Sequence, residues 1–203
     1  MKLAMYGPDG AGKTYFLEHF VEDLIRTGMK EEDIVVFHFR PSVFPNIKKL
    51  ILGKDLTPTE MTNPHRSKPS NELISFIRMI YYWLDYCIGY YISVRPLVKK
   101  GKTVIFDRYI YDIYVDPVRS KIKLPQRLLR FFADIAPQMD ASLIMLCDPD
   151  IIYARKQELS KDEIIRQIGM YRELAESRKT FFVFDSSKDV MENVREARKT
   201  VGI

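Results

Sequence analysis

The sequence predicts an α/β fold in which a five-stranded parallel sheet is flanked by helices on both faces. Three observations predict it: short apolar runs alternate with helical segments, these runs lack interspersed polar positions, and 203 residues suit one domain. Continuous apolar strands between helices are typical of a parallel sheet covered on both faces. The predicted strands are residues 2–6, 34–39, 103–106, 142–147 and 181–184. We therefore expect a single domain over residues 1–203.

A phosphate-binding pattern follows the first strand. Residues 7–14 read Gly-Pro-Asp-Gly-Ala-Gly-Lys-Thr, which matches G-x-x-x-x-G-K-[ST]. Glycines let backbone N–H groups turn toward an anion, so we expect Lys13 to reach the β and γ phosphates of ATP and Thr14 to bind Mg²⁺. Apolar residues recur at helical spacing after Thr14, so the loop lies at the N-terminus of a predicted helix. The pattern indicates a P-loop NTPase, with nucleotide-binding residues Gly7, Asp9, Gly10, Ala11, Gly12, Lys13 and Thr14.

A proline-rich excursion and a long apolar helix follow the second strand. Residues 41–69 contain five prolines, which predicts a mobile segment with a short helix around residues 46–52. Residues 73–94 are nearly all apolar or aromatic and have the length of a membrane span. Because Arg78 and Asp85 interrupt them, we expect a helix buried within the domain and no membrane span.

The third strand ends in an acid and a base, Asp107 and Arg108. Ligands of an open parallel sheet lie beyond the carboxyl ends of its strands, so both side chains are expected to face the phosphate loop. Asp107 can bind Mg²⁺ or orient the attacking oxygen, and Arg108 can bind phosphate through paired hydrogen bonds. The alternative interpretation is a solvated ion pair at the strand end.

Later helices have recognisable starts. Pro125 opens a helix over residues 126–135, and Ser160 with Glu163 forms a capping-box pattern ahead of residues 164–177. A final helix is expected after Ser186 and Ser187.

Composition restricts the partners. The chain carries 32 basic and 27 acidic residues, a balance of +5 that suits polyanionic small molecules and argues against a nucleic-acid partner. Cys87 and Cys147 lie in apolar runs without metal-binding spacing, so we expect reduced, buried thiols in a cytoplasmic protein. The sequence reads directly into a strand, leaving no room for a signal peptide.

These motifs together resemble the thymidylate kinase family of nucleoside monophosphate kinases. The resemblance rests on the phosphate loop, on Asp107-Arg108-Tyr109, on Arg95-Pro96 ahead of Gly101, and on segments 146–149 and 171–175. It covers nearly the whole chain and implies an ATP-dependent kinase that uses Mg²⁺.

The resemblance also implies residue roles. Lys13 and Thr14 match the family's contacts to the ATP phosphates and Mg²⁺, and Asp9 matches the loop acid near the acceptor sugar. Asp107 matches the catalytic acid and Arg108 the phosphate-binding arginine. Arg40 resembles the arginine that contacts the acceptor phosphate, although the glutamate that follows it in the family is absent.

The acceptor side departs from the family pattern. Tyr86 and Cys87 stand where thymidylate kinases carry a base-reading arginine, and residues 110–117 replace the segment that follows the Asp-Arg-Tyr motif. The predicted lid, about residues 150–165, is short. The candidate cations between Asp148 and Tyr171 are Arg155, which we assign to catalysis, Lys156 and Arg166.

One face of the long helix offers an acceptor-binding stripe. Arg78, Tyr82, Asp85 and Gly89 share this face by helical spacing. Tyr82 can stack on a ring, and Arg78 and Asp85 can hydrogen-bond it. The alternative is an internal ion pair between Arg78 and Asp85. Residues 63–68 form a second candidate acceptor loop, for which an exposed charged loop is an equal alternative.

The predicted activity is transfer of the ATP γ-phosphate to a small acceptor. We favour dTMP or a related nucleoside monophosphate. The lost base-reading arginine leaves open a hydroxyl on a sugar or glycan intermediate, and a third hypothesis is an NTPase switch or binding module that needs no acceptor. The family resemblance also makes residues 73–94 a plausible homodimer face.

Overall fold

The computed structural model describes residues 1–44 and 71–203. The chain divides into two compact units. The sheet unit contains Met1–His38, Leu97–Tyr109 and Met139–Ile203, and the helical unit contains Phe39–Pro96 and Ile110–Gln138. A single domain over residues 1–203 stays a prediction. The short helix expected at residues 46–52 and the candidate loop at 63–68 lie outside the described residues, as does most of the excursion over 41–69.

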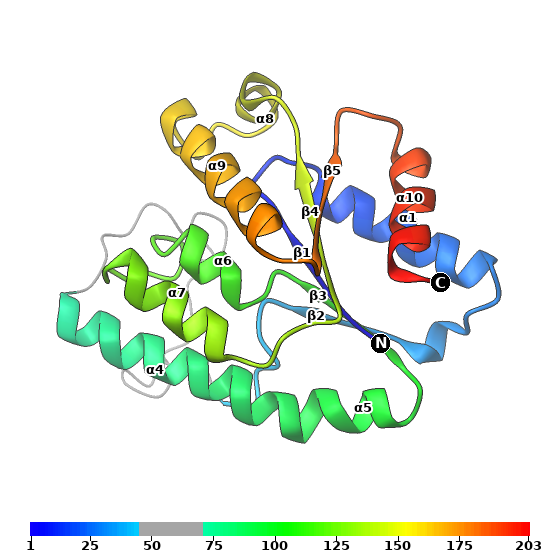
Figure 1. Ribbon diagram of the computed structural model, residues 1–203, viewed down its shortest axis with the longest axis horizontal. Coiled ribbons are helices and arrows are strands. Elements are labelled where there is room, and N and C mark those ends of the chain that lie inside the picture. Colours follow the sequence, from blue (N-terminus) through cyan, green and yellow to red (C-terminus); the bar gives the residue numbers. More distant parts are fainter. Residues whose placement is uncertain (45–70) are drawn as a thin grey trace. The chain divides into compact units, whose positions relative to one another are not determined.

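A five-stranded parallel sheet with the order β2-β3-β1-β4-β5 forms the sheet unit (Figure 1). Its strands are β1 (Lys2–Tyr6), β2 (Ile34–His38), β3 (Thr103–Asp107), β4 (Ala141–Leu146) and β5 (Phe181–Asp185). Each predicted strand is present, with ends shifted by no more than one residue. This confirms the α/β fold with a five-stranded parallel sheet.

Helices of the sheet unit cover both sheet faces. The helical elements of this unit are α1 (Lys13–Arg26), the 3-10 turn η1 (Glu31–Asp33), α8 (Pro149–Arg155), α9 (Lys161–Ser177) and α10 (Val190–Val201). Of these, α1 and α10 pack on one face of the sheet and α9 packs on the other. Successive strand residues point to opposite faces. Met5 therefore packs in one core with Phe16 of α1 and Val194 of α10, helices that lie side by side in Figure 1, while the Tyr6 ring lies 6.2 Å from that of Tyr171 in α9.

A buried carboxylate ties α1 to α10. Asp23 accepts hydrogen bonds from Arg26 at 2.5 Å and from Arg198 at 2.9 Å. Burial alone raises the pKa of Asp23, but the hydrogen bonds and positive charges of both arginines outweigh it and lower this pKa below its ordinary value. The charged carboxylate is therefore part of the folded state.

Helix starts agree in part with the predicted caps. Ser160 accepts the Glu163 N–H at 3.2 Å, but the Glu163 carboxylate accepts hydrogen bonds from Arg166, so the reciprocal half of the capping box is replaced by an ion pair. The final helix is capped by Asp189, whose side chain accepts two backbone N–H groups. The helix therefore begins after Asp189, a few residues beyond Ser186 and Ser187, and the negative charge of the aspartate is favourable at a helix N-terminus.

The helical unit is built from α4 (Glu72–Gly89), the π-helical turn η3 (Tyr90–Val94), α6 (Ile110–Val115) and α7 (Gln126–Ile135), while α5 (Arg95–Lys99) crosses the unit boundary. The predicted long helix is present, but the expectation that it is buried is wrong for one face: Leu73, Ile77 and Tyr91 are 69%, 53% and 61% exposed. Within the described ranges, no helix combines the length and apolarity that a membrane crossing requires.

Candidate active site

The loop after β1 has the backbone that a phosphate cradle requires. Gly7, Gly10 and Gly12 all have positive φ angles, at 136°, 89° and 81°. A Cβ on Gly7 would lie 2.3 Å from the backbone oxygen of Met145 in the neighbouring strand β4. Both the positive φ of residue 7 and the closeness of strand β4 therefore require glycine at this position. The loop ends at Gly12, which is the N-cap residue of α1.

Three charged side chains gather at this loop. Lys13 donates to the Pro8 carbonyl at 2.6 Å and lies 3.9 Å from the carboxylate of Asp9, while Arg108 donates to the same carboxylate. All three are buried, at 6%, 9% and 8% exposure. An ammonium and a guanidinium group at a phosphate-binding loop are both suited to contact the oxygens of a polyphosphate.

Arg108 is held in an uncommon backbone conformation. Its φ is 72°, in the left-handed region that a non-glycine residue rarely adopts. Its N–H donates to the Met5 carbonyl at 3.1 Å, so the bend begins where the β3–β1 pairing ends. Backbone strain of this kind is concentrated at functional sites, where surrounding structure holds it. The bend is what allows the residue after β3 to reach the acid of the phosphate loop.

Asp107 and Thr14 provide the oxygen atoms expected to bind Mg²⁺. Asp107 ends β3 beside His38 at the end of β2, with 3.2 Å between its carboxylate and the His38 Nδ1, and Thr14 is exposed in the first turn of α1. In the described part of the chain, no group of three or more His, Cys, Asp or Glu side chains is arranged to hold a metal ion. A hydroxyl and a carboxylate fit Mg²⁺, which binds few protein groups and keeps water and phosphate oxygens. The contact between His38 and Asp107 was not predicted from the sequence.

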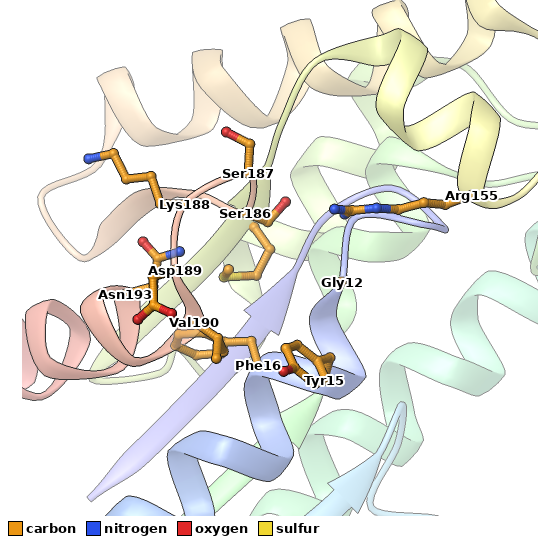
Figure 2. Close-up of a pocket in the computed structure, with 11 residues that line it drawn as sticks. Gly12, Tyr15, Phe16, Arg155, Ser186, Ser187, Lys188, Asp189, Val190 and Asn193 are labelled. Carbon is orange, nitrogen blue, oxygen red and sulfur yellow. The ribbon is translucent and has the colours of Figure 1, made fainter.

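A cavity of about 580 Å³ opens beside the phosphate loop (Figure 2). Arg155 lines it from the end of α8, residues 186–189 line it from the loop after β5, and Val190 lines it from the first turn of α10. The other lining residues are Gly12, Tyr15, Phe16, Met145 and Asn193. Residues 186–190 were not assigned to the site from the sequence. Their main sequence signal is a run of polar residues directly after a strand.

Two of the predicted lid cations, Arg155 and Lys156, lie at the phosphate loop. The Lys156 Cβ lies 3.2 Å from the point where a Cβ on Gly10 would be, and the Arg155 Nη1 lies 3.8 Å from the corresponding point on Gly12. Lys156 pairs with Glu158, and Arg166 is hydrogen-bonded to Glu163.

A second polar cluster lies within the helical unit. Arg40 donates from Nη1 to the Asp85 carboxylate at 2.6 Å and stacks over the Tyr82 ring at 4.8 Å. The Asp85 side chain has no exposed surface and also accepts the Phe44 N–H at 2.8 Å. The stretch that follows β2 is thereby attached to α4.

Comparison with known proteins identifies the family, because the thymidylate kinase family model matches residues 6–197. The chain belongs to the thymidylate kinase family. It is an ATP-dependent phosphotransferase of the P-loop type, and the family's reaction is ATP-dependent phosphorylation of dTMP.

Individual relatives agree with this assignment. A probable thymidylate kinase from Archaeoglobus fulgidus is 26% identical over 207 residues, which cover 99% of this chain and 94% of that protein. The crystal structure of thymidylate kinase from Ehrlichia chaffeensis matches with a TM-score of 0.61 and 16% identity, covering 100% of this chain and 98% of that one. At this identity, the structural match supports the fold.

The long helix carries the two residues, Tyr86 and Cys87, that stand where the resemblance implied a base-reading arginine. Tyr86, at the expected position of the base-reading arginine, is fully buried and donates to the Phe39 carbonyl at 2.9 Å. The neighbouring Cys87 is a free thiol on the same helix, and it is only half-buried, so the expectation of a buried thiol is wrong at this position; its partial burial raises the pKa of the thiol. Cys147, the second free cysteine, is buried as expected.

Arg78 and Asp85 belong to different networks. Arg78 donates to the Lys121 carbonyl at 2.8 Å, whereas Asp85 pairs with Arg40. The alternative of an internal Arg78–Asp85 ion pair is therefore wrong. The shared stripe predicted for α4 holds for Tyr82, Asp85 and Gly89, which all contact the segment after β2.

Proposed function

We propose that this member of the thymidylate kinase family transfers the γ-phosphate of ATP to dTMP. The observation that carries the proposal is the cluster of Asp9, Lys13 and Arg108 at the phosphate loop. It combines groups for binding the donor with an acid that the family places beside the acceptor sugar. Mg²⁺, held by Thr14 and Asp107, would neutralise charge on the β and γ phosphates.

Catalysis by these residues is mainly positioning and electrostatic stabilisation. The loop N–H groups and Lys13 bind the ATP phosphates, with Lys13 leaving the Pro8 carbonyl to contact the anion. Arg108 and Arg155 clamp the transferred group, since guanidinium groups bind phosphoryl oxygens through paired hydrogen bonds. The cavity at Arg155 and residues 186–190 receives the adenosine end of ATP.

The acceptor is bound by separate groups in this proposal. Asp9 accepts a hydrogen bond from the acceptor sugar, and Arg40 binds the acceptor phosphate. Arg78, engaged with backbone carbonyls, stays a weaker candidate for substrate contact. A cytoplasmic location also stays part of the proposal on the strength of family membership.

A Lys13→Ala variant tests the donor site. Loss of its charge from the transition state is expected to cost on the order of 3 kcal/mol, which lowers acceptor-dependent ADP release more than about 100-fold. Lys30→Ala is the matched control, because Lys30 pairs with Glu32 on the surface. Wild-type turnover in Lys13→Ala would contradict the donor assignment.

A sugar or glycan hydroxyl is the second candidate acceptor, favoured by Tyr86 and Cys87 at the base-reading positions. ADP release measured over nucleoside monophosphates and sugars separates the candidates. Stimulation by dTMP supports the first proposal, and stimulation by a sugar without any nucleotide supports the second. Hydrolysis unchanged by every acceptor would instead indicate an NTPase switch.

We also propose that α4 forms a homodimer face. Leu73, Ile77 and Ile88 of α4 and Tyr91 of the adjoining turn η3 are each exposed by 37% or more, and the three residues of α4 lie at helical spacing. A row of exposed apolar side chains on one helix is suited to pairing with a second copy.

A further inference from the structure

We propose that Asp85 is a positioning residue that fixes Arg40 for binding the acceptor phosphate. This inference rests on the proposed function, and it adds a residue whose action on the substrate passes through another side chain.

The arginine is restrained from two directions. The Nη1 of its guanidinium donates a hydrogen bond to Asp85 at 2.6 Å, and its Cζ lies over the Tyr82 ring, 4.8 Å from the ring centroid. Only 12% of the Arg40 side chain is exposed. A long side chain normally loses much rotational freedom on binding a ligand, so holding it beforehand strengthens binding. The remaining N–H groups of the guanidinium suit the oxygens of a phosphate.

Asp85 is itself fixed. Its side chain has no exposed surface, one oxygen binds Arg40, and the other accepts the Phe44 N–H at 2.8 Å. A buried carboxylate is expensive without a charged partner, so the pair constrains both residues. Asp85 therefore holds the guanidinium and the backbone four residues further along the chain.

The backbone around Arg40 is anchored to the same helix. The Tyr86 hydroxyl donates to the Phe39 carbonyl, and Pro41 packs so closely on Gly89 that a Cβ there would lie 2.6 Å from the Pro41 Cβ. Phe39 and Ser42 have positive φ angles of 65° and 55°, conformations that cost free energy in non-glycine residues. Contacts on both sides of Arg40 thus maintain a strained turn that presents this side chain.

Tyr82 has a defined part in this arrangement. One face of its ring is covered by the Arg40 guanidinium, so Tyr82 supports the cation through a cation–π contact. We assign to Tyr82 this supporting role in place of stacking on an acceptor ring with that face.

Steady-state kinetics of the full-length enzyme test the positioning role. Asp85→Asn retains the side-chain volume and an acceptor for the Phe44 N–H but removes the charge that holds Arg40. We expect KM for dTMP to rise about 10-fold or more, while KM for ATP stays within about 2-fold. Asp23→Asn is the matched control, because Asp23 is equally buried and paired with arginines but lies in the sheet unit. It should leave KM for dTMP unchanged.

A double-mutant cycle separates positioning from general structural support. In an Arg40→Gln background, Asp85→Asn is expected to add no further increase in KM for dTMP, because the residue through which it acts is gone. Tyr82→Leu provides a second test if Asp85→Asn fails to fold: it should raise KM for dTMP several-fold, again only when Arg40 is present.

Defined outcomes would overturn the inference. One is an unchanged KM for dTMP in folded Asp85→Asn or folded Tyr82→Leu. Another is a parallel rise in KM for dTMP and KM for ATP. The third is an Asp85→Asn substitution that raises KM for dTMP as much in the Arg40→Gln background as in the wild type. Wild-type enzyme that does not turn over dTMP overturns the acceptor proposal together with this inference, whereas turnover with unaffected variants overturns the positioning role alone.

Discussion

Replacing Gly7 with alanine should disable the phosphate loop through one added methyl group. The new Cβ would lie 2.3 Å from the Met145 backbone oxygen, below the 3.0 Å that real Cβ contacts essentially never cross. The oxygen belongs to a strand paired with β1, so relief requires the loop and β4 to separate. Reaching an ordinary contact of 3.4 Å needs a shift of 1.1 Å, from 3.4 minus 2.3.

Two contributions determine how much Gly7→Ala lowers the free energy of unfolding. The φ of 136° imposes backbone strain of about 1–3 kcal/mol on alanine, and the steric displacement adds about 1–3 kcal/mol as in other overpacked sites. The sum, about 2–6 kcal/mol, is comparable with the stability of many domains. Gly28→Ala is the matched control, because Gly28 has a φ of 107° but nothing within 4 Å of its Cβ position. It should show the strain contribution alone.

The assay combines urea unfolding with ADP binding by calorimetry. We expect Gly7→Ala to lose more stability than Gly28→Ala and to bind ADP at least about 10-fold more weakly, since the loop N–H groups no longer converge. Equal stability losses in the two variants, with wild-type ADP affinity in Gly7→Ala, would refute the steric reasoning.

Two further predictions concern stability and assembly. Asp23→Asn should lower the free energy of unfolding by about 2 kcal/mol at pH 7, with the exposed Arg26 bond discounted against that of Arg198. The pKa of Asp23 is lower in the folded protein, so the ionised carboxylate stabilises the fold above the ordinary pKa of 3.8, and this stabilisation is lost as the pH falls through the folded value. The urea midpoints of wild type and Asp23→Asn should therefore converge in acid, and a midpoint difference that stays constant with pH would contradict this. Glu22→Gln, at an exposed neighbouring position, is the control. Ile77→Glu on the α4 face should convert a dimer to a monomer in sedimentation velocity, whereas Glu72→Gln should not, and a wild-type monomer would exclude the proposed face.

The phosphate-loop side of the site was predictable because its residue types determine its backbone. Glycine at positions 7 and 12, followed by Lys13, restricts the loop to conformations that few other sequences support. Arg108 was placed at the correct sheet edge by the rule that strand ends carry ligands. Its hydrogen bond brings it to Asp9, the other residue to which the resemblance assigned a role here, although the positive φ of Arg108 has no signal in residue type.

The helical unit was harder to predict because its contacts join distant segments. Helical spacing placed Arg78 and Asp85 on one side of α4, yet it could not show that Arg40 would pair with Asp85 or that backbone carbonyls would receive Arg78. Apolarity likewise predicted the helix without showing that Ile77 would be exposed. Sequence periodicity defines a face, but the partner of that face depends on tertiary contacts.

Identification of the product formed from ATP and dTMP tests the central claim most directly. Purified wild-type enzyme, incubated with both nucleotides and Mg²⁺, is predicted to form dTDP and ADP in equal amounts, and Lys13→Ala is predicted to form neither at a comparable rate. ADP released without dTDP, or at a rate independent of dTMP, would contradict the account.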